Sequence, residues 1–375
     1  MKISSAFDGG NIICHDSSDP SNIRLDIRQD QDSEFFQWFY FRLSGAAGQD
    51  CALKLVNAGN AAYPKGWENY RAVASYDRID WFRVATEFDG KNLTIRHRPE
   101  RDSVYYAYFA PYSLERHHDL IARTLQSPRA AMEVLGESLD GREIDLLTIG
   151  EAAADKRKIW AIARQHPGET MAEWWMEGFL ERLLDGNDPV ARALLDKAVF
   201  HIVTNMNPDG SRRGNLRTNA AGINLNREWQ QPSLEKSPEV YWVRGRMEEG
   251  GVDFCLDVHG DEAIPHNFIA GPEGVPSFSK RQGKLLSAYK NALLKANPDF
   301  QIKHGYPANK PGKANLKIGA NWIAERFGCL AMTLEMPFKD LDDGSQRRQG
   351  WSPARSSALG RSNLDAIYSV LDDLR

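Results

Sequence analysis

Two residues near the middle of the chain are spaced so that they could bind a metal ion together. His166 and Glu169 lie three residues apart, after an apolar run typical of a buried strand and before a helical stretch over 171–184. Pro167 disfavours helical backbone at His166, and Gly168 permits a sharp turn. An imidazole and a carboxylate can therefore converge on one point, and zinc favours ligands of both kinds.

Four polar clusters of this kind each follow a strand-like run. The first is His166 with Glu169, and the other three are Asn207-Pro-Asp-Gly210 continuing to Arg217 and Asn224-Leu-Asn-Arg227, Asp257-Val-His259, and Thr333-Leu-Glu335. The carboxyl ends of parallel strands lie at one edge of a sheet, so we expect these clusters to meet in one cleft.

His166, Glu169 and His259 would then hold one zinc ion per chain, with a fourth position left open. An open position is typical of a catalytic rather than a structural zinc site. The pair His166 and Glu169 alone fits a turn with a surface carboxylate better than a metal site. The later histidine and the companion clusters reverse that preference and favour the metal.

Glu335 and two arginines are the candidates for the remaining chemistry. Glu335 ends an apolar run, where a carboxylate needs a buried cationic partner or acts as a general base on water that the metal activates; we favour the base. Arg217 and Arg227 could be ordinary surface cations. Arg227, with Asn226, could instead bind a substrate's terminal carboxylate, and Arg217 could stabilise the oxyanion that forms beside it.

Composition narrows the classes of protein that fit. The chain has 375 residues, about right for two domains. A net charge of −4 argues against a general nucleic-acid binder. No apolar run approaches the roughly 20 residues that cross a membrane, and the N-terminus has no apolar core for a signal peptide. Four cysteines without C-x-x-C spacing predict buried, reduced thiols in a cytosolic protein.

Residues 1–112 are predicted to form an all-β sandwich. Strand-like runs separated by turn residues occur at 23–27, 35–43, 52–56, 70–76, 81–86, 93–96 and 104–109. Many of these runs are aromatic, which the interior of two packed sheets can accommodate. We expect this domain to serve packing or docking, with no chemistry of its own.

Residues 113–375 are predicted to form an α/β domain. A short helix over 114–125 would carry His117 and His118 as surface or linker residues, and Asp140-Gly141 predicts a hairpin. Strands are then expected at 158–164, 198–205, 252–258 and 329–334, and helices near 171–185, 238–249, 278–295 and 314–327. This alternation predicts a mixed, mainly parallel sheet with helices on both faces and an antiparallel hairpin at one edge.

Taken together, these motifs resemble those of the zinc metallocarboxypeptidases, and most closely the cytosolic carboxypeptidase subfamily. The matching segments are His166-Pro-Gly-Glu169, Asn207-Pro-Asp-Gly210, Gly214-Asn-Leu-Arg217, Gly222-Ile-Asn-Leu-Asn-Arg227, His259-Gly260 and Thr333-Leu-Glu335. In the N-terminal part, Gln37-Trp-Phe-Tyr-Phe41, Asp80-Trp-Phe-Arg83 and Tyr106-Ala-Tyr-Phe-Ala-Pro-Tyr112 resemble the sandwich that precedes the catalytic domain in that subfamily.

The resemblance implies a role for each site residue, with the terminus of a peptide or protein as substrate. It implies that His166, Glu169 and His259 bind zinc and that Glu335 is the general base and proton shuttle. It also implies that Arg217 polarises the scissile carbonyl, while Asn226 and Arg227 hold the terminal carboxylate.

This chain departs from the family in two places. Asn224 stands where the family usually has an aspartate beside a zinc histidine, which would make that ligand less basic. Secreted relatives also close a tyrosine over the substrate. The corresponding region, 304–318, has Tyr306 followed by lysines, and no tyrosine is assigned that role.

The same loop, 304–318, could determine which C-terminal residue the protein prefers. Several eukaryotic members of the subfamily remove glutamate, and Lys310, Lys313 and Lys317 could bind such acidic side chains, or could form an ordinary solvated loop.

Two other functions use the same motifs. One is a zinc deacylase or amidase acting on N-acyl amino acids or cell-wall peptides, and the other is a catalytically silent binding module. Self-association through the N-terminal domain is compatible with each of them.

Overall fold

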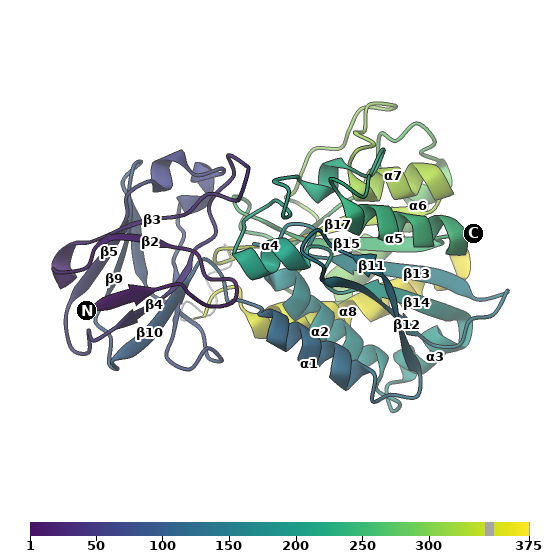
Figure 1. Ribbon diagram of the computed structural model, residues 1–375. Helices are drawn as coiled ribbons and strands as arrows, with labels where there is room; N and C mark the ends of the chain where they lie inside the picture. The colour runs from purple at the N-terminus through teal and green to yellow at the C-terminus, as the bar shows by residue number, and fades with distance from the viewer. Residues whose placement is uncertain (342–348, 375) are drawn as a thin grey trace.

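The computed structural model describes residues 1–341 and 349–374. A β-rich N-terminal part, at the left of Figure 1, packs against a larger part in which helices cover a central sheet. The first part contains every strand from residue 2 to 107, and the second contains those from 130 to 337. We propose residues 1–112 and 113–375 as the domain limits.

The N-terminal part contains two five-stranded sheets with an aromatic interior. Buried rings such as Phe39, Trp67 and Tyr108 pack against one another in its core. In spatial order the first sheet is β1 (Lys2–Ser4), β4 (Tyr40–Ser44), β10 (Ser103–Ala107), β6 (Val73–Ser75) and β7 (Phe82–Arg83). The second is β2 (Ile13–Asp16), β3 (Ile23–Asp26), β5 (Cys51–Leu55), β9 (Leu93–His97) and β8 (Ala85–Phe88).

The larger part is organised around a seven-stranded mixed sheet. Its order is β11 (Ala130–Glu137), β12 (Glu143–Ile149), β14 (Ala198–Val203), β13 (Arg157–Ala163), β15 (Phe254–Asp261), β17 (Leu330–Pro337) and β16 (Phe268–Ala270). The central strands β14, β13, β15 and β17 are parallel, whereas β11, β12 and β16 are antiparallel to their neighbours. The carboxyl ends of four parallel strands are thus brought side by side.

Apolar side chains on both faces of this sheet explain the two helical layers. Along β13, Ile159 and Ala161 face one core, and Trp160 and Ile162 face the other. The first core is covered by α2 (Met171–Leu183), α6 (Lys280–Ala296) and α8 (Pro353–Val370), and the second by α5 (Pro238–Gly250) and α7 (Gly319–Phe327). The other α-helices of the described residues are α1 (Leu114–Thr124), α3 (Pro189–Lys197) and α4 (Pro208–Arg213).

Helices α2 and α8 approach each other closely because two glycines lie at their contact. A Cβ on Gly178 would lie 2.1 Å from the carbonyl oxygen of Ser357, and one on Gly360 would lie 2.1 Å from that of Trp175. A larger residue at either position would push the helices apart. The tight contact holds α2, which begins two residues after Glu169, against the body of the domain.

The two parts share one continuous apolar core. Tyr108 of the N-terminal part stacks on Phe338, which follows β17, with ring centroids 4.4 Å apart. Buried Arg83 donates to the carbonyl oxygen of Phe338 at 2.8 Å. Arg71 also pairs with Asp340. These contacts fix the sandwich next to the carboxyl end of a central strand.

The predicted fold class is confirmed: a mixed, mainly parallel sheet between helices follows an all-β sandwich. The elements that were not predicted are α3, α4, α8, β16 and the N-terminal strands β1 and β2. Several predicted elements are shorter; for example, α7 begins only at Gly319 and β4 only at Tyr40, and the strand expected at 70–76 is only β6.

Two predictions about single residues are wrong. His117 is not a surface or linker residue: it is 6% exposed, and its Nδ1 lies 2.8 Å from Glu173 Oε1 on α2, while His118 is exposed. Its helix packs that side inward because Leu120 and Ile121 are buried beside it. Cys14 is exposed on β2, whereas the other three cysteines are buried and all four are free thiols.

Among the described residues, no helix has both the length and the apolar character needed to cross a membrane.

Candidate active site

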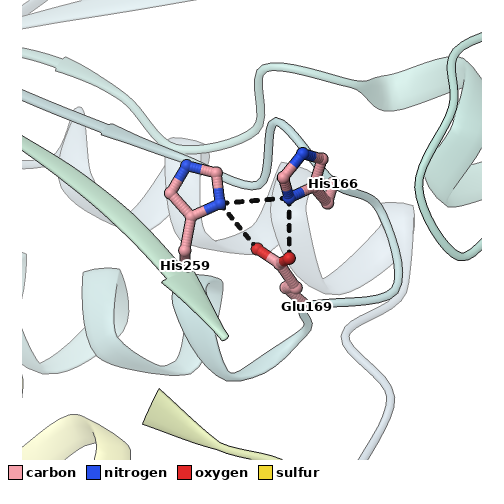
Figure 2. Close-up of side chains that lie close together, drawn as sticks. All are labelled: His166, Glu169 and His259. Atoms are coloured by element: carbon pink, nitrogen blue, oxygen red, sulfur yellow. Dashed lines mark hydrogen bonds and ion pairs between the residues drawn. The ribbon is translucent and has the colours of Figure 1, made fainter. Parts of the chain in front are cut away.

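Three predicted ligands converge at the carboxyl edge of the sheet (Figure 2). Donor atoms of His166, Glu169 and His259 all lie within 4.8 Å of one another. His166 Nδ1 is 2.7 Å from Glu169 Oε1, and His259 Nδ1 is 2.8 Å from Glu169 Oε2. The two Nδ1 atoms are 3.2 Å apart. All three side chains are buried, so this group could hold a metal ion.

Oxygen atoms face the outer nitrogen of each imidazole. His166 Nε2 lies 3.1 Å from Asn224 Oδ1, and His259 Nε2 lies 2.9 Å from Asp257 Oδ1. An acceptor on Nε2 favours the tautomer with its proton there, which leaves the Nδ1 lone pair directed at the centre. The two imidazoles differ in this outer partner, because His166 has a neutral amide there and His259 has a carboxylate.

Backbone constraints explain the shape of the loop that carries two of the ligands. Arg164, at the end of β13, has a left-handed backbone with φ of 61°. Its guanidinium donates to the carbonyl oxygens of Pro167 (3.0 Å) and Tyr112 (2.9 Å) and also contacts Glu173. Gly168 is needed for close approach, since a Cβ there would lie 2.8 Å from the carbonyl oxygen of Leu216.

The charges around the centre fit a cation. Burial lowers the pKa of His166 to about 4. Burial would also lower the pKa of His259, but the carboxylates of Asp257 and Glu169 outweigh it and raise this pKa. The carboxylates thus favour a positive charge at this centre. A divalent cation bound to three donors would supply it, as in three-ligand zinc sites.

Glu335 lies beside the three ligands with one oxygen unsatisfied. It is the partner of His259 in the pairing of β15 with β17. The side chain is 7% exposed, and its Oε2 has no hydrogen-bond partner among the described residues. Burial, together with the neighbouring carboxylates of Glu169, Asp261 and Glu262, raises the pKa of Glu335. A bound cation would offset this effect.

The ligands and Glu335 line a pocket of about 440 Å³. Its wall includes residues from both domains, among them Tyr63 of the N-terminal part. The N-terminal part thus contributes to the pocket wall, and the expectation that it has no chemistry of its own stays a prediction. A larger hollow of about 690 Å³ lies between β11 and α5, but its described lining contains no histidine.

Arg217 lines the same pocket and is held by aromatic rings. Its guanidinium carbon lies 5.3 Å from the ring centroid of Tyr63 and 5.7 Å from that of Phe35. Burial alone would lower its pKa, but Tyr63 and the pocket carboxylates, Glu262 first, outweigh that effect and raise it. Arg217 is thus a permanent cation facing the carboxylates.

The predicted carboxylate-binding residues also reach the pocket. Asn226 Oδ1 accepts a hydrogen bond from the backbone N–H of Gly319 at 2.8 Å, and its Nδ2 lies 3.4 Å from His259 Nε2. Arg227 donates to the carbonyl oxygen of Asn226 at 2.6 Å. Arg217, Asn226 and Arg227 therefore lie on the same pocket wall as the three ligands.

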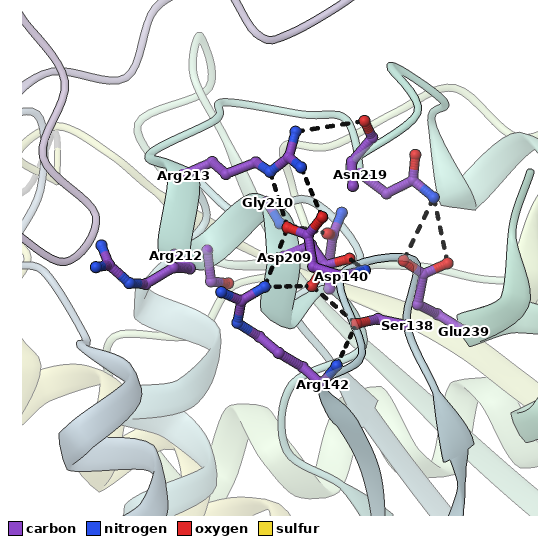
Figure 3. A network of polar contacts seen from close by, with 12 residues as sticks. Ser138, Asp140, Arg142, Asp209, Gly210, Arg212, Arg213, Asn219 and Glu239 are labelled. Atoms are coloured by element: carbon purple, nitrogen blue, oxygen red, sulfur yellow. Dashed lines mark hydrogen bonds and ion pairs between the residues drawn. The ribbon is translucent and has the colours of Figure 1, made fainter.

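The Asn207–Gly210 cluster, by contrast, is structural. Asn207 caps α4 by accepting from the backbone N–H of Gly210 at 3.0 Å. Asp209 points to the β11–β12 hairpin, where Ser138 and Arg142 each donate to its Oδ1 at 2.8 Å (Figure 3). This cluster anchors the segment that leads to Arg217.

The lysines proposed for substrate binding are placed elsewhere. Lys310, Lys313 and Lys317 are exposed and absent from the pocket lining, as in the solvated-loop alternative. Lys290 on α6 lines the pocket instead, together with Glu273. Burial lowers the pKa of Lys290, and Glu273 acts against this effect.

Several lining residues were not predicted. Tyr306 donates to Asp261 Oδ2 at 2.5 Å, and its hydroxyl oxygen lies 3.4 Å from Glu335 Oε1. Asp261 and Glu262 directly follow His259-Gly260, so a run of carboxylates at a strand end was the available signal. Tyr63 carries no such signal, because nothing in its local sequence connects it to a site in the other domain.

Comparisons with known proteins agree with this geometry. Residues 120–346 match the family model "Zinc carboxypeptidase", and residues 3–109 match "Cytosolic carboxypeptidase N-terminal domain". An uncharacterized protein of Zymomonas mobilis is 55% identical over 374 residues, which cover 100% of this chain and 97% of that protein.

Two solved structures are similar over nearly the whole chain. A metallo-carboxypeptidase from Burkholderia cenocepacia is 52% identical, with a TM-score of 0.96 and 99% of each chain covered. A metallo-carboxypeptidase from Pseudomonas aeruginosa, in complex with (2-guanidinoethylmercapto)succinic acid, is 47% identical, with a TM-score of 0.97 and 100% of each chain covered.

The curated cytosolic carboxypeptidases are longer proteins. Human cytosolic carboxypeptidase 2 is 30% identical over 303 residues, and the match spans 71% of this chain but only 33% of that protein. The family model covers well over half of the chain, and the two bacterial structures share its whole length. The chain therefore belongs to the zinc carboxypeptidase family.

Proposed function

We propose that this protein binds one zinc ion through His166, Glu169 and His259 and hydrolyses the last peptide or isopeptide bond of a peptide or protein tail. The observation that supports this most is the convergence of three buried donor groups within 4.8 Å, beside a buried carboxylate with an unsatisfied oxygen. A zinc ion held there supplies Lewis acidity, which makes water a better nucleophile at neutral pH.

The other side chains around this centre have separate roles in the proposed reaction. Glu335 accepts the proton of the attacking water and passes it to the leaving amine. Arg217 stabilises the negative charge that develops on the carbonyl oxygen. Arg227 and the Asn226 amide bind the terminal carboxylate, for which guanidinium is well suited. The hydrogen bond from the Gly319 N–H to Asn226 Oδ1 fixes the orientation of this amide, whose Nδ2 is the donor.

Side-chain preference is the finer part of the proposal. Lys290 favours an acidic C-terminal residue, and its position on the pocket wall supports this preference better than the exposed lysines 310–317 do. Glu273, which lines the same pocket, would favour a basic C-terminal residue instead. The ligand bound in the structure of the Pseudomonas relative carries a guanidino group, which is a basic group of this kind. Lys290→Met and Glu273→Gln should therefore shift the preference in opposite directions.

The proposal also includes the cellular location of the protein and its self-association. We propose a cytosolic location, in line with the three buried thiols and the cytosolic carboxypeptidase relatives. Self-association through the N-terminal domain stays a prediction.

A release assay over peptides tests the proposal. We expect zinc-loaded protein to release single C-terminal residues, to lose this activity with a chelator, and to regain it when zinc is added. Peptides with an amidated C-terminus serve as the matched control and should be cleaved far more slowly, since Arg227 then has no carboxylate to bind.

Other results would favour the alternatives. Turnover of N-acyl amino acids or cell-wall peptides alone would identify a deacylase or amidase with the same catalytic groups. Purified protein without stoichiometric zinc and without turnover would identify a binding module.

A further inference from the structure

A buried carboxylate of the N-terminal domain binds the backbone of the loop that carries Arg217. Asp30 is 2% exposed. Its Oδ1 accepts a hydrogen bond from the N–H of Leu216 at 2.6 Å, and its Oδ2 accepts from the N–H groups of Arg217 (2.8 Å) and Thr218 (3.0 Å). The Thr218 hydroxyl adds a fourth bond, at 3.1 Å.

Three successive N–H groups that point at one anion form a concave donor site of the kind that binds phosphates in other proteins. Here the anion is a side chain from another domain. A buried carboxylate is costly to desolvate, and burial raises the pKa of Asp30 even though the N–H donors act in the opposite direction. The hydrogen bonds of Asp30 therefore determine the backbone conformation of residues 216–218, which apolar packing between the domains alone would not determine.

The conformation of this loop determines two parts of the active site. Arg217 projects from it into the pocket, against the rings of Tyr63 and Phe35. The carbonyl oxygen of Leu216 accepts the N–H of Gly168 at 2.9 Å. Asp30 thus binds the backbone of Arg217 directly and is connected through Leu216 to the loop that carries His166 and Glu169.

Other contacts hold the loop from both sides. In the N-terminal domain, Asn11 donates to the carbonyl oxygen of Gly214 at 2.7 Å and Arg28 to that of Arg213 at 2.6 Å. On the opposite side, Arg213 makes a bidentate pair with Asp140 of the hairpin, at 2.7 and 3.0 Å (Figure 3). These contacts involve Arg213 and Gly214. Asp30 instead binds residues 216–218, the segment that contains Arg217.

We propose that Asp30 is a positioning residue for catalysis, through which the N-terminal domain holds Arg217 at the reacting carbonyl. This inference rests on the proposed function, because it assigns Asp30 an effect on that reaction. Asp30 makes no hydrogen bond to the side chains of His166, Glu169 or His259 among the described residues, and its direct bond to the Arg217 backbone makes Arg217 the main route of its effect. A displacement of about 1 Å in such a group can cost about 10²-fold in rate.

A double-mutant cycle separates positioning from general stability. We expect Asp30→Asn to lower kcat by about 10²-fold, with zinc content unchanged. In an Arg217→Met background the same substitution should change kcat by less than about threefold, because the group that it positions is already absent. An equal loss in both backgrounds, or a wild-type kcat for Asp30→Asn, would overturn the proposal.

Asp340→Asn is the matched control, since it changes a carboxylate to an amide at another contact between the domains. Asp340 pairs with Arg71 and Arg83 and does not touch the loop. We expect kcat to stay near the wild-type value. If Asp30→Asn does not fold, Thr218→Val removes only the hydroxyl bond to Asp30. Thr218→Val should lower kcat by less than is expected for Asp30→Asn. In the Arg217→Met background it should not lower kcat further.

Hydrogen exchange measures the loop without any turnover. In Asp30→Asn the amides of residues 214–222 should exchange faster than in the wild type, and in Asp340→Asn they should not. If the wild type shows no carboxypeptidase activity, the proposed function fails while the exchange result still decides whether Asp30 holds the loop. Unchanged exchange at 216–218 would refute that role.

Discussion

The metal-ligand cluster and the Arg217 loop line one pocket but are built in different ways. His166 and Glu169 follow β13, and His259 lies near the end of the neighbouring parallel strand β15, so the sheet itself brings them together. Arg217 lies in irregular backbone that is held by hydrogen bonds from another domain. The first arrangement depends on strand pairing within one domain, and the second depends on how the two domains fit. Loss of the contacts between the N-terminal domain and this loop should therefore impair transition-state stabilisation before it impairs metal binding.

The largest effect is expected for Glu335→Gln, which tests the metal-ligand side. The amide keeps the shape of the side chain but cannot accept the proton from water. We expect kcat to fall by about 10²- to 10⁴-fold, the range that general acid–base catalysis contributes. Zinc stoichiometry should stay at the wild-type value. A variant with near-normal kcat would remove Glu335 from the mechanism.

Arg217→Met tests the other side of the comparison. It retains an apolar chain against Tyr63 and Phe35 but loses the cation. Removal of one oxyanion donor typically costs about 10²- to 10³-fold in kcat. Zinc affinity should change little, and Arg212→Met, at an exposed arginine of α4, is the control. A loss of zinc in Arg217→Met would show that the two sides are not separable.

His117→Gln probes the buried network behind the metal-ligand cluster. His117 contacts Glu173, which also binds Arg164 at the start of the ligand loop. Burial alone would lower the pKa of His117, but Asp145 and Glu173 outweigh it and raise the pKa from 6.5 to about 9. The loss of one partner in a buried ion pair typically costs about 3–5 kcal/mol.

The sign of this effect depends on pH. Because the folded-state pKa is the higher one, the stabilisation is complete below pH 6.5 and is lost as the pH rises through about 9. Denaturant unfolding of His117→Gln should therefore show a deficit at pH 6 that narrows above pH 9. Exposed His118→Gln should show none, and a deficit independent of pH would contradict the charge on His117.

The smallest effect is expected for Asn224→Asp, which gives His166 the charged partner that His259 already has in Asp257. A carboxylate on Nε2 makes the imidazole a more basic ligand. Competition with a chelator should show zinc bound about 10-fold more tightly, near the lower end of reported effects of such partners. Identical affinities would mean that Asn224 does not influence the ligand.

The same contrast explains what could be predicted from the sequence. The ligands, Glu335 and the parallel sheet were predictable because their signals are local: polar residues follow apolar runs. Asp30 was not, since it lies 186 residues from Leu216, to which it is bonded. Helix α8 was missed because serines and glycine interrupt its apolar pattern, and they serve its close contact with α2. Tyr306 lies in a loop, where no periodicity indicates which way a side chain points.

The account depends most directly on one zinc ion held between two imidazoles and a carboxylate. Anomalous scattering from crystals of the zinc-loaded protein, recorded on both sides of the zinc absorption edge, measures this position. We predict one peak per chain at about 2.0–2.2 Å from His166 Nδ1, His259 Nδ1 and a Glu169 oxygen. A peak elsewhere, or an imidazole turned away from the peak, would contradict the account.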